Sequence, residues 1–340
     1  MKLLILGGTS FVGRHMTQAA IDRGHEVTLF HRGQTNPGIF PAAQKVVGDR
    51  MDGLEPLAFG KWDAVIDTSG YLPRAVSLSA QFLKERADRY IYISTLSVYA
   101  DKSFAGITEE HEVEQLEDPE SEDIPAYYGA LKAASEQRAA EAFGGRLLVI
   151  RPGVVAGPYD STDRLTYWPR RVAEGGAILV PEQQAPFQCI DGRDLAAWTM
   201  AMAEQKETGI YNAVGTPGVY TFRGMVEACR SAVNRNAELV PVDEHWLLEQ
   251  GVRPFTDIPL WIAASDRERS GFMQVSARKA ELKGLRCRPL EQTFEDLWAW
   301  DRGRLDNPHR TGMSRGREAE LLQAWQTVSK GGDSFGDSRH

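Results

Sequence analysis

Tyr128 and Lys132 stand four positions apart in an alanine-rich segment, residues 126–143, whose composition is typical of a helix. Side chains four residues apart share one face of a helix, so the phenol and the ammonium group point in the same direction. A nearby positive charge stabilises a phenolate and lowers the pKa of a tyrosine below its ordinary value of about 10. Such a pair could exchange a proton with a hydroxyl or a carbonyl group near neutral pH.

A second group of polar side chains follows the apolar run at residues 89–93. Ser94, Thr95 and Ser97 carry hydroxyls directly after this run, which has the pattern of a buried strand. Open α/β sheets bind ligands at the carboxyl ends of their strands. A hydroxyl at that place can hydrogen-bond a reacting oxygen and stabilise the charge that develops on it. The alternative is a threonine that caps the end of the strand.

The first residues have the pattern of a nucleotide-binding turn. Residues 3–6 are an apolar run without alternation, typical of a strand buried on both faces, and residues 15–23 have the pattern of a helix. Glycines between them would let the chain turn, open backbone N–H groups to a diphosphate and allow close helix packing. The alternative is an ordinary turn between a strand and a helix. The sequence predicts a dinucleotide-binding loop made of Gly7, Gly8, Thr9, Ser10, Phe11, Val12 and Gly13.

The residues after the second predicted strand, residues 26–30, indicate which dinucleotide fits. An acidic residue there would bind the ribose 2′-hydroxyl of NAD. This sequence instead has His31 and Arg32. Because a guanidinium binds phosphate oxygens in pairs, we expect NADP(H), with Arg32 and His31 at the 2′-phosphate. NAD is the alternative, in which Arg32 is a solvated loop residue.

Strands and helices alternate along the first 151 residues. Strands are predicted at 3–6, 26–30, 45–50, 89–94 and 146–151, a strand together with its following loop at 62–71, and helices at 15–23, 73–86 and 126–143. This alternation predicts an α/β fold with a Rossmann-type doubly wound parallel sheet. We expect residues 1–151 to form the dinucleotide-binding domain, with a segment around 186–203 returning to it. Residues 152–330, with a helix at 314–329, would form a smaller substrate-binding portion, and 331–340 a mobile tail.

The composition argues against several classes of partner. The chain has 340 residues and a net charge of −8, which disfavours nonspecific nucleic-acid binding. Cys189, Cys229 and Cys287 have neither metal-ligand spacing nor a disulfide pattern, so we expect no metal and a reducing, cytoplasmic location. No apolar run approaches the roughly 18 residues of a membrane span. The acidic segment 104–124 is expected to be a solvated loop.

These motifs, in this order, resemble the extended short-chain dehydrogenase/reductases, also called the NAD-dependent epimerase/dehydratase family. The resemblance covers about the first 215 residues and includes the segments 151–158, 191–196 and 209–215. It implies catalytic roles for Tyr128, Lys132 and Thr95, with Lys132 also holding the nicotinamide ribose and with Ser94 as the alternative to Thr95. Members of that family often dimerise through the tyrosine-bearing helix, so the resemblance suggests a homodimer but leaves the oligomeric state open. Further cofactor contacts are implied at Asp49, Thr68, Ser69 and Gly70.

Departures from the family pattern narrow the expected function. Leu96 and Ser97 stand where dehydratases of the family carry Asp-Glu, so elimination of water is not expected. Phe187 stands where many sugar-nucleotide enzymes carry an arginine for the substrate diphosphate, so a nucleotide sugar is disfavoured. Serine 10, in place of the middle glycine of the loop, is similar to an atypical branch of the family.

Aromatic and basic side chains gather in the segment 160–171. They could line a substrate pocket, or the aromatic ones could pack between the two portions while the arginines are solvated. Together with Ser94 and Ser97 they are the substrate residues that we expect: Arg164, Tyr167, Trp168 and Arg171.

Three functions remain open from the sequence. The first is an NADP(H)-dependent oxidoreductase that reduces a ketone or oxidises a secondary alcohol of a small molecule, with Tyr128 as acid and base. The second is an epimerase of a sugar or sugar nucleotide that retains its cofactor. The third is a non-catalytic nucleotide- or RNA-binding protein, because plant chloroplast proteins that bind RNA resemble this branch at the glycine loop.

Overall fold

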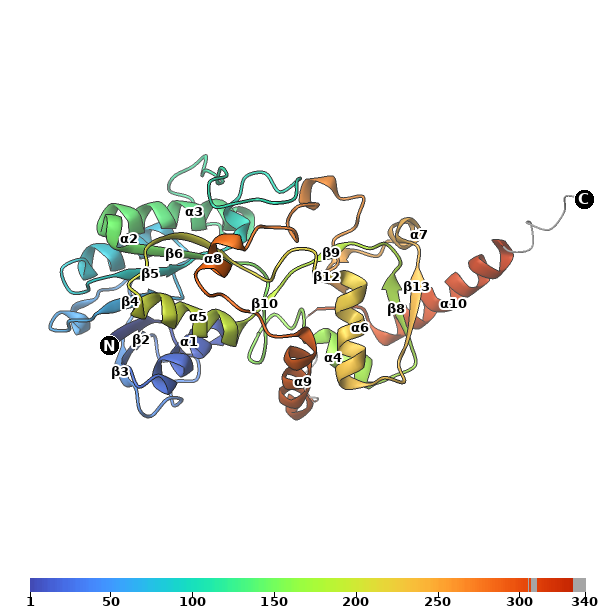
Figure 1. Cartoon of the computed structure of the whole chain (residues 1–340), viewed down its shortest axis with the longest axis horizontal. Coiled ribbons are helices and arrows are strands. Elements are labelled where there is room, and N and C mark those ends of the chain that lie inside the picture. Colours follow the sequence, from blue (N-terminus) through green and yellow to red (C-terminus); the bar gives the residue numbers. More distant parts are fainter. Residues whose placement is uncertain (305, 307–310, 333–340) are drawn as a thin grey trace, which may run out of the picture. The chain divides into compact units, whose positions relative to one another are not determined.

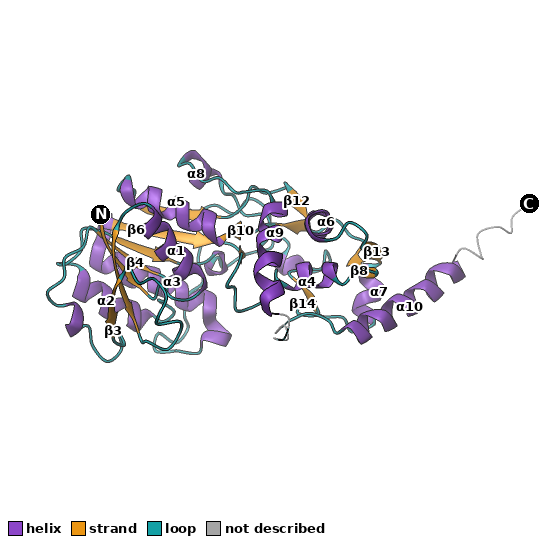
Figure 2. Ribbon diagram, turned by 90° about the horizontal axis from the view of Figure 1, so that it is seen from below, coloured by secondary structure: helices purple, strands orange, loops and turns teal. Residues whose placement is uncertain are grey.

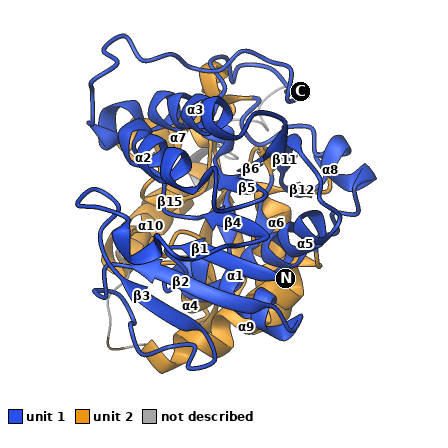
Figure 3. Cartoon of the chain, turned by 90° about the vertical axis from the view of Figure 1, so that its left-hand side faces the viewer, with its two compact units in different colours: residues 1–159, 188–217, 271–287 blue, residues 160–187, 218–270, 288–340 orange. Residues whose placement is uncertain are grey.

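The computed structural model describes residues 1–304, 306 and 311–332. The chain divides into two compact units, each built from three segments (Figure 3). Unit 1 comprises residues 1–159, 188–217 and 271–287, and unit 2 comprises residues 160–187, 218–270 and 288–340. The segment expected to return near 186–203 thus lies almost wholly in unit 1, whereas the return at 271–287 had no signal in the sequence pattern.

A seven-stranded parallel sheet forms the centre of unit 1 (Figure 1). Its order is β11-β6-β5-β4-β1-β2-β3, so the order reverses between β1 and β4 and a crevice opens where the chain leaves these two strands. The strands are β1 (Lys2–Leu6), β2 (Glu26–His31), β3 (Gln44–Val47), β4 (Ala64–Asp67), β5 (Tyr90–Ile93), β6 (Leu147–Pro152) and β11 (Gly209–Ala213). The predicted doubly wound α/β fold is confirmed.

Helices cover both faces of this sheet (Figure 3). Leu3 and Ile5 of β1 pack toward α1 (Phe11–Asp22) and α5 (Gly192–Glu204), whereas Leu4 and Leu6 pack toward α2 (Pro73–Leu83) and α3 (Ile124–Phe143). Because both faces are covered, β1 is apolar at every one of these positions and shows no alternation. The apolar run at the start of the sequence therefore becomes the central strand.

Shorter elements complete unit 1. They are β7 (Val155–Ala156), which pairs in parallel with β10 (Ile190–Asp191), the helix α8 (Arg278–Leu282), and the single turns η1 (Glu55–Leu57), η2 (Leu96–Val98) and η3 (Gly144–Arg146). Ala280 and Leu285 from the third segment are buried in the same apolar cluster as β1 and α1. The third segment is therefore part of the core of unit 1.

Unit 2 is built from short strands and helices (Figure 2). Trp168 packs edge to face on Phe222, with ring centres 5.5 Å apart, and Arg171 forms a buried ion pair with Glu318 at 2.7 Å. These contacts join three helices of the unit. Its elements are α4 (Tyr167–Ala173), β8 (Ala177–Pro181), β9 (Pro186–Phe187), β12 (Tyr220–Thr221), α6 (Phe222–Val233), β13 (Glu238–Val242), α7 (Glu244–Glu249), β14 (Pro254–Phe255), β15 (Ile258–Pro259), η4 (Arg267–Arg269), α9 (Leu290–Asp301), η5 (Arg302–Arg304) and α10 (Arg315–Gly332).

Three expectations differ from the structure in detail. The helix predicted at 73–86 ends at Leu83, because Trp62 pairs with the next residues and its N–H donates to the Arg86 carbonyl at 2.9 Å. The strand predicted at 45–50 ends at Val47. The acidic segment 104–124 is a loop, but it is not wholly solvated, since Ile107 is buried and Glu109 accepts the Asn212 N–H.

Two remaining expectations concern the end of the chain and membranes. Residues 333–340, most of the predicted tail, lie outside the described residues. In the part of the chain that the structure describes, no helix is long and apolar enough to span a bilayer.

The close packing of α1 on the glycine loop gives a first prediction. Gly13→Ala is expected to lower the free energy of unfolding by about 1–3 kcal/mol, because a Cβ there would lie 2.7 Å from the Gly8 nitrogen and 2.8 Å from Thr68 Oγ1. Urea unfolding at an unchanged m-value measures the difference. Gly38→Ala is the matched control, since a Cβ at position 38 meets no atom within 4 Å. Equal losses in both variants would contradict the prediction.

Candidate active site

The glycine loop lies where β1 ends, beside the loop that follows β4. Gly7 and Gly8 have φ angles of +102° and +89°, which side chains with a Cβ rarely adopt. A Cβ on Gly7 would lie 2.7 Å from Thr68 Oγ1, and this hydroxyl donates to the Leu6 carbonyl at 3.0 Å. The two loops therefore lie against each other at the reversal of strand order.

The start of α1 is open to an anion. The Thr17 hydroxyl lies 2.9 Å from the carbonyl oxygens of both Gly8 and Gly13 and shares its proton between them. This shared hydrogen bond holds the loop against the helix. Ser10 precedes the helix with φ −128°, an extended conformation that needs no glycine, and its exposed hydroxyl does not cap α1. The first N–H groups of the helix are left facing the loop, where a phosphate group would be stabilised.

Lys132 joins the ends of two neighbouring strands. Its ammonium donates to the Gly70 carbonyl, after β4, at 2.8 Å and to the Ile93 carbonyl, at the end of β5, at 2.7 Å. The side chain is only 3% exposed and lies 4.1 Å from the centre of the Tyr92 ring. Burial lowers the pKa of Lys132 to about 7, although the carboxylates of Asp67 and Glu136 act to raise it.

Tyr128 begins the regular part of α3. Tyr127 has φ −124° and ψ 29°, outside the helical range, so the helix is continuous only from Tyr128 onward. A Cβ at Gly129 would collide with the Ser97 carbonyl and with Glu114, so glycine allows α3 to approach η2 closely. This approach brings the helix that carries Tyr128 and Lys132 against the turn that carries Thr95 and Ser97.

The two neighbouring hydroxyls at the end of β5 have different environments. Ser94 Oγ donates to Glu136 at 2.5 Å, and Glu136 also forms a buried ion pair with Arg151 at 2.7 Å. Thr95 Oγ1 accepts the Ser97 N–H at 3.1 Å and so caps η2. The hydroxyl of Ser94 is therefore committed to an internal ion pair, and Thr95 is the better candidate for a substrate contact.

A buried ion pair beneath the β4 loop was missed by the sequence reasoning. Asp67 accepts two hydrogen bonds from Arg50 at 2.8 Å each, one from the Tyr90 hydroxyl at 2.7 Å and one from the Ser69 N–H at 3.1 Å. Burial by itself would raise the pKa of Asp67, but the Arg50 guanidinium lowers it below the ordinary value. The only signal in the sequence was an acid that ends an apolar strand.

His31, Arg32 and Asp49 lie at the ends of β2 and β3. His31 is 8% exposed, its Nδ1 accepts the Gly33 N–H at 3.0 Å, and its Nε2 has no partner among the described residues. Burial lowers the pKa of His31, so the ring is neutral and its proton sits on Nε2 as an unused donor. Arg32 is exposed, and Asp49 accepts the Met51 N–H at 2.9 Å.

The predicted substrate residues of the segment 160–171 all belong to unit 2. Trp168 is 1% exposed and donates to the Pro259 carbonyl at 3.2 Å, and Arg171 is bound to Glu318, so both stabilise the unit itself. Tyr167 packs edge to face on Trp168. Arg164 donates to Thr162 at 3.0 Å and remains partly exposed.

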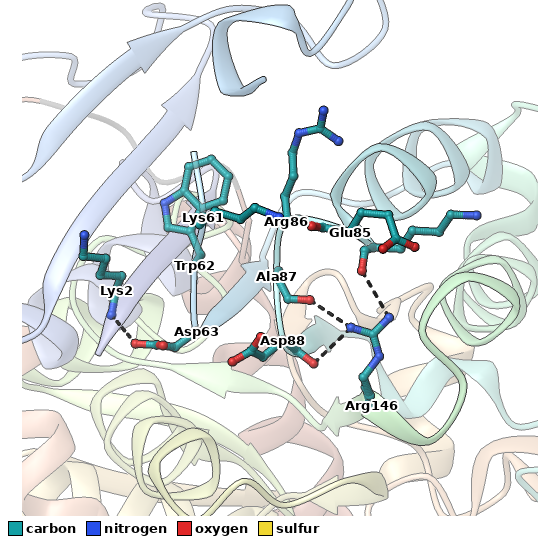
Figure 4. Close-up of a pocket in the computed structure, with 10 residues that line it drawn as sticks. Lys2, Lys61, Trp62, Asp63, Glu85, Arg86, Ala87, Asp88 and Arg146 are labelled. Carbon is teal, nitrogen blue, oxygen red and sulfur yellow. Dashed lines mark hydrogen bonds between the residues drawn. The ribbon is translucent and has the colours of Figure 1, made fainter. Parts of the chain in front are cut away.

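A hollow of about 420 Å³ opens on unit 1 at the amino ends of β1, β4 and β5 (Figure 4). Two of its basic side chains are bound to backbone carbonyls: Arg146 donates to Ala87 at 2.9 Å, and Lys61 donates to Glu85. This hollow lies at the edge of the sheet opposite to the glycine loop. It is therefore separate from the groups described above.

Comparison with known proteins agrees with this arrangement. The model of the NAD dependent epimerase/dehydratase family matches residues 74–214, which include β5, β6, Tyr128 and Lys132. The central part of the chain is therefore similar to this family. Solved structures share the fold: a UDP-glucose 4-epimerase superposes with a TM-score of 0.65 at 18% identity, covering 91% of this chain and all of that one. The enzyme WbmH of Bordetella bronchiseptica, in complex with NAD+, gives 0.65 at 17% identity, covering 88% and 98%.

Two curated relatives show weaker but informative similarity. The chain is 28% identical over 250 residues to the chloroplast stem-loop binding protein of 41 kDa b of Arabidopsis thaliana, covering 68% of this chain and 63% of that protein. It is 28% identical over 187 residues to the 2-alkyl-3-oxoalkanoate reductase of Stenotrophomonas maltophilia, covering 47% and 52%. The matched region therefore spans less than two thirds of either relative.

Because Lys132 is buried, we expect its contribution to the free energy of unfolding to become more favourable as the pH rises. The pKa of Lys132 is about 7 in the folded protein, whereas a lysine in the unfolded chain has the ordinary pKa of 10.5. Between pH 7 and 10.5, the unfolded chain therefore binds a proton at this lysine that the folded protein does not bind. Each pH unit in that window then favours the folded state by up to about 1.4 kcal/mol. Urea unfolding of wild type and Lys132→Met at pH 7, 8 and 9 should show a difference that moves in favour of wild type.

Other titrating groups are common to both proteins, so they cancel in this difference. A difference that is the same at all three pH values would mean that Lys132 keeps its ordinary pKa.

Proposed function

We propose that the protein is an NADP(H)-dependent oxidoreductase of the short-chain dehydrogenase/reductase type. It reduces a ketone or oxidises a secondary alcohol of a small molecule. The observation that carries this proposal is the buried Lys132 ammonium at the ends of β4 and β5, one helical turn after Tyr128. A buried amine at the crevice of a parallel sheet, beside a tyrosine and Thr95, suits proton transfer to a substrate oxygen.

The residues at the crevice fit a dinucleotide. A Cβ at Gly8 would lie 2.8 Å from Leu29 and one at Gly13 would lie 2.7 Å from the Gly8 nitrogen, so this close-packed turn tolerates only glycine at both positions. His31 adds an unused buried N–H. The loop from Gly7 to Gly13, together with Thr68, Ser69, Gly70 and Asp49, would hold the cofactor, and the nicotinamide supplies or accepts a hydride when bound.

The chain's own residues would then handle the proton. In the reducing direction, Tyr128 donates its phenolic proton to the substrate oxygen while the carbonyl carbon gains a hydride, and solvent returns the proton afterwards. Thr95 donates a hydrogen bond to the same oxygen. Lys132 uses two of its three N–H bonds for Gly70 and Ile93, and we assign the third to the nicotinamide ribose.

Three features support a small ketone as the substrate. The family's dehydratase acids are replaced by Leu96 and Ser97. Gln188, beside the position of the family's diphosphate-binding arginine, donates to the carbonyls of Gly215 and Val275 and so is not available to a ligand. One of the relatives is named as a reductase of 2-alkyl-3-oxoalkanoates, which are ketones.

A cofactor-retaining epimerase is the second candidate. It is favoured by the solved structures that share this fold, several of which are sugar-nucleotide epimerases. Cofactor that stays bound through purification would favour it, whereas net consumption of NADPH would favour the oxidoreductase. A relative named as a stem-loop binding protein keeps RNA binding as an alternative, but the net charge of −8 and the buried Lys132 favour an enzyme.

Replacement of Tyr128 tests the acid–base assignment. Tyr128→Phe should reduce NADPH-dependent turnover of a panel of 3-oxo compounds by about 10²–10⁴-fold and leave NADPH affinity nearly unchanged, because only the proton donor is removed. Tyr127→Phe is the matched control, since Tyr127 is 46% exposed on the same helix. Full activity in Tyr128→Phe would falsify the assignment.

Cofactor choice tests the role of Arg32. Wild type should bind NADPH about tenfold or more tightly than NADH, because a guanidinium pairs with the 2′-phosphate. Arg32→Ala should remove most of that preference by weakening NADPH alone. Titration of both cofactors by fluorescence measures the two affinities. A strong preference of wild type for NADH would contradict the NADP(H) proposal.

A further inference from the structure

Arg14 occupies a fixed position directly after the last glycine of the loop. Its guanidinium stacks on the ring of Tyr159 at 3.6 Å from the ring centre. Tyr159 is itself held, because its ring lies 5.9 Å from that of His15 and His15 bonds the neighbouring Pro158 carbonyl at 3.0 Å. A flexible side chain is therefore immobilised at the first turn of α1.

The Arg14 guanidinium donates to no protein acceptor in the part of the chain that the structure describes. Most other arginines of unit 1 are bound to a carboxylate or a backbone carbonyl. These are Arg23, Arg50, Arg74, Arg86, Arg138, Arg146, Arg151, Arg193 and Arg286. An arginine that is immobilised but unpaired has its donors available for a ligand.

The direction of the side chain points to the ligand. In a helix, long side chains lean toward the N-terminus, so Arg14 extends toward the turn that contains Ser10 and Gly13. The N-terminus of α1 already carries a partial positive charge, and Arg14 adds a full one. The exposed Ser10 hydroxyl, in place of the middle glycine, adds a further donor beside it. Together these groups suit a doubly charged anion.

We propose that Arg14, held in place by Tyr159, binds the diphosphate bridge of the dinucleotide. This inference rests on the proposed function, since it names a further binding residue of the same cofactor site. Arg14 and Arg32 then recognise different parts of the cofactor. Arg14 binds the diphosphate bridge that NAD(H) and NADP(H) share, and Arg32 binds the 2′-phosphate that only NADP(H) carries.

Four ligands separate these two roles. NADPH carries both groups, NADH and ADP carry only the diphosphate, and adenosine 2′-monophosphate carries only the 2′-phosphate. The affinities of full-length wild type, Arg14→Ala and Arg32→Ala are measured for each by calorimetry. Arg23→Ala is the matched control, because Arg23 follows the other end of α1 and is bound to Glu204.

Arg14→Ala should weaken NADPH, NADH and ADP by about tenfold and leave adenosine 2′-monophosphate unchanged, since a charge-assisted bond to phosphate is lost. Arg32→Ala should show the complementary pattern. Tyr159→Ala should weaken the same three ligands as Arg14→Ala, whereas Tyr159→Phe, which keeps the ring, should not. Arg23→Ala should leave all four affinities unchanged.

Two results would overturn the inference while leaving the proposed function intact. One is an unchanged affinity of Arg14→Ala for NADPH, NADH and ADP. The other is an equal loss for all four ligands, which would indicate a general disturbance of the loop. If wild type binds none of the dinucleotides, both the inference and the proposed function fail.

Discussion

The ammonium of Lys132 connects the parts of unit 1 on which a reaction would depend. It binds carbonyls at the ends of β4 and β5, and it is carried by α3, which packs on the face of the sheet that α2 also covers. A buried charge is tolerated only when it is hydrogen-bonded, so the two carbonyls and the cation require one another. The position of α3, and with it that of Tyr128, is thereby fixed relative to the strand ends.

Two buried ion pairs flank this lysine and hold the ends of the neighbouring strands in place. Arg50 and Asp67 lie on one side, and Arg151 and Glu136 lie on the other. Both carboxylates also accept from neighbours, Asp67 from Tyr90 and Glu136 from Ser94. Such pairs contribute little net stability compared with apolar packing, but they fix polar groups in one arrangement. We infer that their role is to hold the loops after β4 and β5 where Lys132 needs them.

The same charges set the electrostatics of the crevice. Asp67 and Glu136 act against the burial that lowers the pKa of Lys132, and the result is a lysine that titrates near neutral pH. The glycine loop, by contrast, carries backbone N–H groups, Ser10 and Arg14, and no acid follows β2. In the proposed reaction, the glycine loop would bind the phosphates and the end of the crevice near Lys132 would exchange the proton.

Much of this arrangement follows from the sequence alone. Unbroken apolar runs predict strands buried on both faces, and the glycines between residues 3–6 and the first helix predict the turn, because these signals are local. The spacing of Tyr128 and Lys132 places them on one helix face for the same reason. Boundaries were less certain: the first helix begins at Phe11 rather than near residue 15.

Only the tertiary structure decided how distant residues meet. Gly70 and Lys132 are 62 residues apart in sequence, and nothing local indicates that the carbonyl of one binds the ammonium of the other. Local patterns do not indicate the ion pair of Arg50 with Asp67 at the end of β4, the stacking of Arg14 on Tyr159, or the return of residues 271–287 to unit 1. Periodicity and composition indicate whether a residue lies on the buried or the exposed face of its helix or strand. Which partner it meets there depends on how the strands are ordered in the sheet.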